Sequence, residues 1–430
     1  MRFEAVDAAS AIGGRLVGPN VVIDGVSFDS RSLLPGQLFV PLVADRDGHE
    51  FIDGALDRGA SAYLTSRPAG AGTAIEVPDT LRALMQLAAA FRPRFHGPVI
   101  GVTGSVGKTS TKDLAWAALA TAKRTWANER SFNNEQGLPT TLLNAPADTE
   151  VMVLEMGMRG LGEIAALCDI ARPTIGVVTR VAEAHSDLLG GIHGVARAKA
   201  ELVRALPAHG TAVLNADDPR VRAMSTASAA EVLLYGEASD AQVRVCDVVL
   251  DELARPSFTL RSPWGTVSVT LGISGRHMVS NAAAALACVG LVGGDLAVAA
   301  AALAEVGLTA MRMEVHRTAT GAIVLNDSYN ANPTSMRAAL DALAALPAPR
   351  KRAVLGLMAE ISDPVAEHLA VVEYAAERGI EVLAYGTHLY GVEPVADPVK
   401  ALGSLASGDA VLVKGSRVIG LERVAAALVL

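Results

Sequence analysis

The sequence predicts an α/β protein of three domains, and three observations lead to this prediction. The chain has 430 residues, which is too long for one ordinary hydrophobic core and fits two or three domains. Strand-like runs alternate with helix-like runs in at least two places, which favours parallel α/β construction. One such strand leads into a glycine-broken loop, VIGVTGSVGKTSTKD at residues 99–113, of the kind that binds phosphate.

The first unit is predicted over residues 1–96 as a small α/β domain. Residues 20–42 contain short β-rich runs broken by turn residues, and residues 49–60 have a helical pattern. The segment FRPRFHGP at residues 91–98 resembles a linker. The chain is therefore expected to leave this domain near His96.

The second unit is predicted over residues 97–317 as a parallel-sheet domain of the P-loop ATPase type. It opens with the strand PVIGV and closes after MRMEVH. Its other expected strands are EVMVLEMG, TIGVVT and GTAVLN, each followed by a helical or loop segment. The third unit, residues 318–430, repeats the alternation with the strands GAIVLND, KRAVLGL, IEVLAYG and DAVLVKG.

Composition limits the classes of partner. A net charge of −8 argues against a nucleic-acid surface. Hydrophobic residues make up 51% of the chain, but its most apolar window, residues 281–308, is built from Ala and Gly and is interrupted by Asp295 and Glu305. That window reads as buried helices, so no membrane insertion is expected.

The N-terminal residues and the cysteines favour a cytoplasmic location. MRFEAVDAAS lacks the basic stretch and apolar segment of a signal peptide. Cys168, Cys246 and Cys288 are far apart and lie in apolar runs, which gives neither metal spacing nor a disulfide framework. We expect a cytoplasmic protein, and a monomer.

The phosphate loop is a variant with the pattern T-G-x-x-G-K-T. Gly104 and Gly107 allow the backbone to turn its N–H groups toward an anion, and the helix that begins near Lys108 adds its positive dipole end. Lys108 can reach the β- and γ-phosphate oxygens, and the Thr109 hydroxyl can bind Mg²⁺. The predicted phosphate cradle consists of Gly104, Ser105, Val106, Gly107, Lys108, Thr109 and Ser110.

Three further residues follow the expected strands of the central unit in an order that suits phosphate chemistry. Glu155 comes directly after an apolar run, a usual position for a second metal ligand beside a nucleotide. His185 follows the next strand, and Lys199 lies on a probable helix 14 residues later. Each residue alone is a weak signal, since isolated Glu and Lys residues usually lie on the surface. Their order together favours a nucleotide and metal site.

Several longer motifs carry a resemblance to a known family. They are FNNEQGLPTTLLN, EMGMRGLGEIAALCDIARPTIGVVT, GVARAKAEL, LNADDP, GRHMVSNAAAALA, NDSYNANPTSMRAAL and VLVKGSR. Together with the variant loop and His185, they resemble the Mur ligases, ATP-dependent amide-forming enzymes of peptidoglycan precursor synthesis. Within that family, DSYNANPTSMRAAL and VLVKGSR most resemble the members that add D-alanyl-D-alanine to a UDP-N-acetylmuramoyl tripeptide.

The resemblance implies a nucleotide site shared by the second and third domains. Lys108 and Thr109 would bind the ATP phosphates and Mg²⁺, with Glu155, His185 and Lys199 as further metal ligands. Lys199 matches a lysine that is carbamylated in several Mur ligases, and the sequence leaves open whether it is modified here. The nucleotide would also be contacted by Asn281 at the adenine, Arg312 at the γ-phosphate, Asp327 at the ribose, and Tyr329 and Asn330 nearby.

The resemblance also implies where the substrates bind and how they react. Lys108, His185, Lys199 and Arg312 would be the catalytic residues. The first domain would hold the uridine diphosphate group, and a Rossmann-like third domain would bring the amine and close on ATP. Predicted substrate contacts are Ser30, Arg31, Asp47, Gly48, His49, Asn133, Asn134 and Lys414.

Three departures from the family pattern keep alternatives open. Arg180 stands where the family usually has asparagine, and Leu357 stands where the D-alanyl-D-alanine-adding members commonly have aspartate; residues 362–409 are also divergent. A Mur-like ligase for another amino acid or peptide, or a nucleotide-binding scaffold that has lost ligation, would fit these changes. The third peptide residue stays undetermined. The lone histidines His316, His368 and His388 are candidate substrate contacts, but such residues are more often at the surface or locally hydrogen-bonded.

Overall fold

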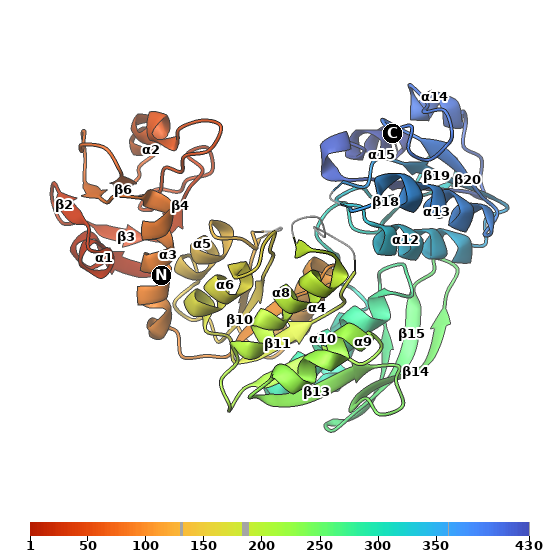
Figure 1. The fold of residues 1–430 in the computed structure, drawn as a ribbon, viewed down its shortest axis with the longest axis horizontal. Helices are drawn as coiled ribbons and strands as arrows, with labels where there is room; N and C mark the ends of the chain where they lie inside the picture. Colours follow the sequence, from red (N-terminus) through yellow and green to blue (C-terminus); the bar gives the residue numbers. More distant parts are fainter. Residues whose placement is uncertain (130–131, 183–188, 360, 430) are drawn as a thin grey trace.

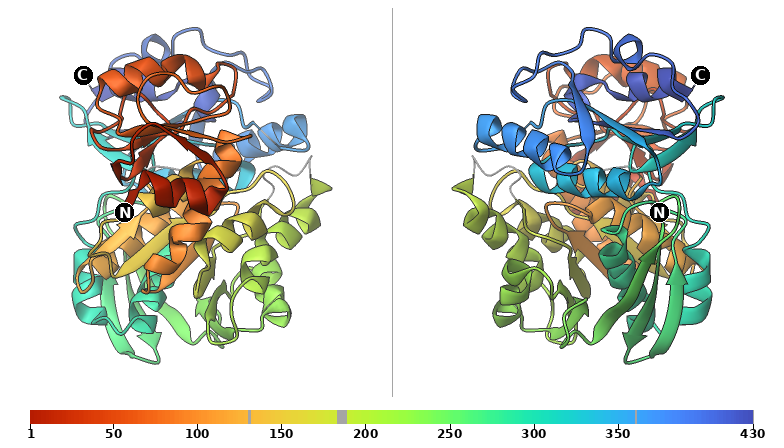
Figure 2. Two further views of the ribbon diagram at one scale, coloured as in Figure 1. Left: turned by 90° about the vertical axis from the view of Figure 1, so that its left-hand side faces the viewer. Right: turned by 90° about the vertical axis from the view of Figure 1, so that its right-hand side faces the viewer.

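The computed structural model describes residues 1–129, 132–182, 189–359 and 361–429, and these build three α/β units (Figure 1). The red and orange N-terminal unit and the blue C-terminal unit stand at opposite ends of the central unit, and both side views place them above it (Figure 2). The predicted fold class is confirmed. Within the described ranges, no helix combines the length and apolar character needed to cross a membrane.

The N-terminal unit has two sheets and three α-helices. Strand β1 (Arg2–Glu4) pairs antiparallel with β3 (Val22–Asp24). A five-stranded sheet has the order β2-β7-β6-β5-β4, in which only the β2–β7 pair is antiparallel. Its strands are β2 (Arg15–Val17), β4 (Val26–Ser27), β5 (Leu38–Phe39), β6 (Ala62–Thr65) and β7 (Ala74–Glu76), and the helices are α1 (Ala5–Ile12), α2 (Ile52–Asp57) and α3 (Thr80–Phe91).

Helix α3 joins the N-terminal unit to the central one. Leu84, Leu87 and Ala88 are fully buried on this helix, which packs against α5 (Gly137–Leu143) and α6 (Glu163–Ala171). These apolar side chains lie in one hydrophobic cluster with residues of the central sheet. The two units therefore share a core, and the expected linker at residues 91–98 leads directly into it.

The central unit is built on one nine-stranded sheet with the order β16-β15-β14-β13-β12-β11-β8-β10-β9. The six pairings from β9 to β14 are parallel, and β14, β15 and β16 continue as an antiparallel meander. The strands are β8 (Val99–Thr103), β9 (Thr125–Ala127), β10 (Val151–Glu155), β11 (Ile175–Val178), β12 (Thr211–Asn215), β13 (Glu231–Gly236), β14 (Val243–Leu250), β15 (Pro256–Ser262) and β16 (Gly265–Thr270).

Helices cover both faces of this sheet, which explains why the inner strands are apolar throughout. All five residues of β8 and of β10 are buried. The apolar window of the sequence forms α10 (Met278–Leu291) and α11 (Leu296–Ala302), and α10 packs against α4 (Lys108–Ala120). The window thus forms helices, as predicted, and α10 is almost entirely buried. The described part of this unit also contains α8 (Ile192–Arg204) and α9 (Pro219–Ala223).

The C-terminal unit is a five-stranded sheet with the order β17-β18-β21-β19-β20. Strand β17 (Glu314–Arg317), which the sequence placed at the end of the central unit, pairs antiparallel with β18, so this sheet begins before position 318. The other pairs are parallel. Its remaining elements are β18 (Ile323–Asp327), α12 (Pro333–Ala345), β19 (Arg350–Leu355), α13 (Pro364–Ala376), β20 (Ile380–Ala384), α14 (Pro398–Leu402), β21 (Asp409–Lys414) and α15 (Glu422–Val429).

Candidate active site

The phosphate loop connects β8 to α4, and its two glycines are required by space as well as by backbone angle. Gly104 has φ +152°, and a Cβ there would lie 1.9 Å from Thr179 Oγ1. Gly107 has φ +85°, and a Cβ there would lie 2.6 Å from Asn281 Oδ1. The Ser105 N–H donates to the carbonyl of Arg180, which ties the loop to the end of β11. The loop is therefore held open at the N-terminus of α4, where a helix attracts anions.

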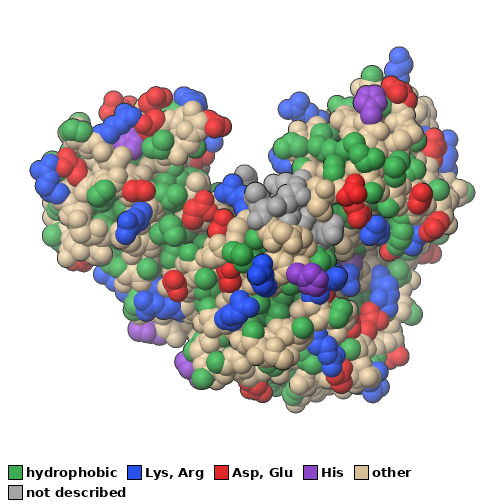
Figure 3. All heavy atoms as spheres, in the orientation of Figure 1, with side chains coloured by type: hydrophobic (Ala, Val, Ile, Leu, Met, Phe, Trp, Pro, Cys, Tyr) green, Lys and Arg blue, Asp and Glu red, His purple; other side chains and the backbone are tan. Residues whose placement is uncertain are grey.

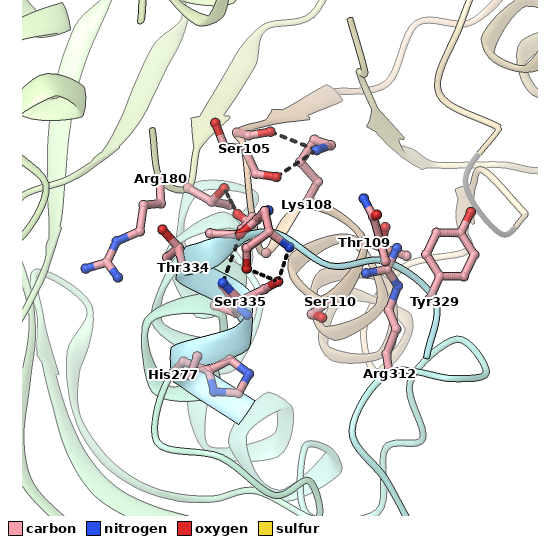
Figure 4. A pocket seen from close by; sticks show the side chains of 18 of the residues that line it. Ser105, Lys108, Thr109, Ser110, Arg180, His277, Arg312, Tyr329, Thr334 and Ser335 are labelled. Carbon is pink, nitrogen blue, oxygen red and sulfur yellow. Dashed lines mark hydrogen bonds between the residues drawn. The ribbon is translucent and has the colours of Figure 1, made fainter. Parts of the chain in front are cut away.

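Lys108 bends back over this loop. Its ammonium donates to the carbonyl of Gly104 at 2.8 Å and lies 3.4 Å from that of Ser105, as the dashed lines in Figure 4 show. Burial lowers the pKa of Lys108, the Glu155 carboxylate partly opposes this, and Arg312 adds to it. The lysine is thus placed among the groups that the sequence assigned to the phosphates. Thr109 follows it in the first turn of α4 and is 2% exposed.

Glu155 and Lys199 are buried ionisable groups with incomplete partners. Glu155 ends β10; its Oε1 accepts a hydrogen bond from Asn133 Nδ2 at 2.6 Å, while Oε2 is buried and has no partner within the described chain. Lys199 on α8 is 2% exposed and has neither a hydrogen bond nor an ion pair among the described residues. Burial and the charge of Lys108 hold the pKa of Lys199 well below its usual value, against the raising effect of Glu155. Unpaired buried charges are costly, so this pair suits a ligand that brings its own charges.

A third group of predicted residues lies at the junction with the C-terminal unit. The Arg312 guanidinium lies 4.3 Å from the centre of the Tyr329 ring, and its buried Nε has no hydrogen bond within the described chain. Figure 4 shows the two side chains facing each other beside the phosphate loop. Asn281 on α10 is 7% exposed and touches the loop where Gly107 passes it.

The sequence analysis missed His277, which lies one residue before α10. Its Nδ1 is buried and has no hydrogen bond within the described chain. Burial lowers the pKa of His277, and the carboxylate of Asp327 opposes that shift. The available signal was its position in GRHMVSN, one helical turn before Asn281. His277 therefore adds a buried ring nitrogen to the residues that line the cavity beside the phosphate loop.

Lys414 was predicted as a substrate contact, and the structure pairs it with predicted nucleotide residues. Its ammonium is 2% exposed and donates to Asp327 Oδ2 at 2.6 Å and to the carbonyl of Asn330 at 2.7 Å. Strands β18 and β21 are parallel neighbours with Asp327 opposite Lys414 in register. The lysine therefore holds the carboxylate and the loop after β18 in place.

One cavity of about 1090 Å³ brings most of the predicted residues together between the central and C-terminal units. Its lining includes Gly104, Ser105, Val106, Gly107, Lys108, Thr109, Ser110, Asn133, Asn134, Glu155, Lys199, Asn281, Arg312, Asp327, Tyr329, Asn330 and Lys414. His185, the remaining catalytic and metal candidate, lies outside the described residues. Among the residues that are described, no group of three or more His, Cys, Asp and Glu side chains is arranged to hold a metal.

The predicted contacts in the first domain lie outside this cavity, and their charged side chains are paired with nearby residues of the same domain. Arg31, next to Ser30, donates twice to the Asp29 carboxylate, at 2.9 and 2.8 Å. Asp47, which precedes Gly48, accepts from the backbone N–H and lies 2.6 Å from the Nδ1 of His49. None of these residues lines the cavity, and Figure 3 shows a deep hollow between the first and third units.

Comparison with known proteins gives consistent matches along the chain. The family model for the Mur ligase middle domain matches residues 102–289, and the model for the Mur ligase glutamate ligase domain matches residues 311–417. A protein of Mycobacterium tuberculosis named UDP-N-acetylmuramoyl-tripeptide–D-alanyl-D-alanine ligase is 40% identical, over 94% of this chain and 92% of its own. The protein of that name from Escherichia coli is 35% identical, over 97% of this chain and 96% of its own.

Solved structures agree with these sequence matches. A crystal structure of MurF from Acinetobacter baumannii superposes with a TM-score of 0.90 at 27% identity, covering 100% of this chain and 99% of that one. A crystal structure of MurF ligase from Thermotoga maritima in complex with ADP has a TM-score of 0.83 at 28% identity, covering 93% and 96%. The resemblance that the motifs carried is therefore confirmed.

Proposed function

The chain belongs to the Mur ligase family, and from that premise we propose that it is an ATP-dependent ligase that joins D-alanyl-D-alanine to a UDP-N-acetylmuramoyl tripeptide in peptidoglycan precursor synthesis. One observation carries the chemistry: Glu155 Oε2, buried without a hydrogen-bond partner among the described residues, and the buried Lys199 line a single cavity with Lys108. Such groups suit a polyphosphate and its cation. The relatives that carry the proposed name span nearly the whole chain.

The donor set fits Mg²⁺. The unpartnered Oε2 of Glu155 and the hydroxyl of Thr109 are oxygen ligands of the kind Mg²⁺ takes beside a nucleotide. Bound there, Mg²⁺ would neutralise phosphate charge and orient the γ-phosphate. Burial lowers the pKa of Lys199 well below the usual value and so favours the neutral amine, the form that adds CO₂ and loses a proton to become a carbamate. That product would be an anion.

The reaction has two steps, and the cavity's own cations serve the first. The C-terminal carboxylate of the tripeptide attacks the γ-phosphorus of ATP, the bond to the β-phosphate oxygen breaks, and ADP leaves. Lys108 and Arg312 offset the repulsion between the two anions and stabilise the charge that spreads over the transferred group. The products of this step are an acyl phosphate and ADP.

The second step needs the amine and the absence of water. The amine nitrogen attacks the acyl carbon, a tetrahedral intermediate forms, and phosphate leaves as the nitrogen gives up a proton. Acyl phosphates hydrolyse readily, so closure of the third domain on the central one would protect this intermediate. Asp327 lies in the third domain and Lys108 in the central one, which would couple nucleotide binding to that closure.

The test is phosphate release from ATP and Mg²⁺ with UDP-N-acetylmuramoyl tripeptide, with and without D-alanyl-D-alanine, together with the mass of the product. We expect release that requires both substrates and a product heavier by one dipeptide residue. Release with a different amine only would replace the proposed amine and keep the ligase. No release with any amine would overturn the activity and favour a nucleotide-binding scaffold.

A further inference from the structure

Two loops at the carboxyl end of the C-terminal sheet are bound to each other along their backbones. The loop after β19 begins at Gly356, whose N–H donates to the carbonyl of Lys414 at 2.8 Å. In return, Ser416 in the loop after β21 donates its N–H to the carbonyl of Leu357 at 2.9 Å. A Cβ on Gly415 would lie 3.0 Å from the Gly356 Cα, so the two chains are in close contact. The loops form one unit at the edge of the cavity.

His368 binds the backbone of the loop after β19 at Met358. It lies on α13, is fully buried, and its Nε2 accepts the backbone N–H of Met358 at 2.9 Å. Its Nδ1 lies 2.5 Å from the carbonyl of Pro364, which can only accept. The ring is therefore neutral, with the proton on Nδ1 and the lone pair of Nε2 directed at Met358.

Two more side chains fix the same loop. Tyr390 packs edge-on against the His368 ring, with 4.7 Å between ring centres, and its hydroxyl donates to the carbonyl of Gly356 at 2.8 Å. The Ser416 hydroxyl accepts the N–H of Ala359 at 2.9 Å. Ala359 lines the main cavity, as does Lys414. The position of the His368 ring therefore determines where the backbone of residues 356–359 meets the cavity.

The order of the strands separates this loop from the nucleotide contacts. Strand β21 lies between β18 and β19, so Asp327 and the residues 356–359 follow strands on opposite sides of Lys414. Ligands of such sheets bind outside the carboxyl ends of the strands. If Asp327 and Arg312 take the nucleotide, Ala359 borders the part of the cavity left for the other substrate carried by this domain.

We infer that His368 is a positioning residue for the amine substrate: it fixes the backbone of Met358 and Ala359 against which the dipeptide is held for attack on the acyl phosphate. The inference rests on the proposed function. His368 does not reach the cavity and acts through the loop. Its loss should therefore weaken the amine step and leave nucleotide binding intact.

Acid should affect this contact in a defined direction. Protonation of Nε2 removes its lone pair, so the imidazolium cannot accept the Met358 N–H. Burial holds the pKa of His368 below its ordinary value, which places the loss on the acid side of pH 6.5. Tyr390 is the titratable group in ring contact with His368. Two ion pairs lie nearby: Arg337 of α12 with Glu367 of α13, and Asp341 of α12 with Arg378 in the turn after α13.

The experiment compares three variants of the full chain by the KM for D-alanyl-D-alanine, ATP and the UDP-tripeptide. His368→Leu removes the acceptor, His368→Gln restores one at the Nε2 position, and Val371→Ala trims a buried side chain of the same helix that makes no loop hydrogen bond. We expect His368→Leu to raise the dipeptide KM about tenfold with the other two constants unchanged, because small displacements of a positioned group cost this much or more. His368→Gln should stay near the wild type and lack its acid-side loss, and Val371→Ala should lower only the melting temperature.

Several results would overturn the inference. An unchanged dipeptide KM in His368→Leu would do so, as would equal rises in all three constants or the same rise in Val371→Ala. If the wild-type chain forms no amide with any amine, the proposed function fails, and amide hydrogen exchange then decides. Faster exchange at residues 356–359 in His368→Leu, but not in His368→Gln, would show that His368 fixes the backbone of this loop. Equal exchange in both variants would show that it does not.

Discussion

The cavity around Lys108 and the polar cluster around His49 contain similar residue types and differ in how far those residues satisfy each other. In the cavity, Glu155 Oε2 and Arg312 Nε are buried without partners in the described chain. In the first domain, His49 is 7% exposed and both ring nitrogens are engaged, Nδ1 by Asp47 and Nε2 by Ser66. Buried groups without partners cost stability, whereas a closed network supports the local fold.

Whether buried polar groups have partners in the chain distinguishes motifs that bind a ligand from motifs that stabilise the fold. Residues whose partners are missing indicate a ligand, because folding alone does not account for their burial. Residues whose partners are all local are explained by the fold that they stabilise. We therefore expect substitutions in the cavity to remove activity at little cost in stability, and substitutions in the His49 cluster to do the reverse.

The largest effect is expected for Lys108→Ala. Loss of the ammonium removes a charge that stabilises the transferred phosphate, so product formation should fall roughly 10²- to 10³-fold or more. Thermal unfolding should be nearly unchanged, since Lys108 is bonded only to carbonyls of its own loop. Product formation is followed by mass and unfolding by circular dichroism. Near-normal turnover would show that the phosphate loop has no part in the mechanism. The contrast between the Lys108 cavity and the His49 cluster would then fail.

Lys199→Met should lower activity and raise stability. Replacing a buried, unpaired amine by an apolar side chain of similar length is expected to raise the free energy of unfolding by about 1–2 kcal/mol at pH 7. The pKa of Lys199 is lowered on folding, so the unfolded chain binds the proton more tightly. Wild-type stability should therefore rise with pH from the lowered pKa up to about 10.4, the ordinary lysine value, and this rise should be absent in the variant.

Chemical denaturation of both proteins at several pH values measures this effect. A less stable Lys199→Met variant would indicate that Lys199 is not a free amine in solution, for example because it is carbamylated. Partial rescue of activity by a small added carboxylic acid would point the same way.

In the first domain, His49→Ala should act mainly on stability. It removes two buried hydrogen-bonded contacts, which is expected to cost about 2 kcal/mol. The KM for ATP should not change, because His49 is remote from the cavity. Melting temperature and KM values are measured on the same preparation. A large rise in the KM for the UDP-tripeptide without loss of stability would make this cluster a binding site and weaken the contrast.

The smallest effect is expected for Arg31→Ala. The side chain is 87% exposed, so its ion pair with Asp29 contributes little to stability, and the melting temperature should stay within about 1 °C. As a predicted contact of the diphosphate, the guanidinium should matter to binding, and we expect the KM for the UDP-tripeptide to rise roughly fivefold. No change in that constant would leave Arg31 without a role in binding.

The parts of the site that sequence reasoning predicted are those set by local chain geometry. The pattern T-G-x-x-G-K-T follows from the positive φ of Gly104 and Gly107, and Glu155 was found because it ends an apolar strand. The pairing of Lys414 with Asp327 was not predicted, because it depends on β18 and β21 being neighbours across 87 residues of sequence. His277 was missed, and His368 was given low weight, for a related reason. A lone histidine shows its role only when its partners in space are known.

The bond between Lys414 and Asp327 also limits how the protein can change over generations. A substitution at either position alone leaves a buried charge unmatched, which costs several kcal/mol. Exchanging the two residues would restore neutrality but would place an ammonium at the position that we expect to accept hydrogen bonds from the ribose. A lineage that drifts at these positions must therefore pass through a less stable or less active intermediate. This makes the pair slow to alter, even under selection by an inhibitor that binds beside it.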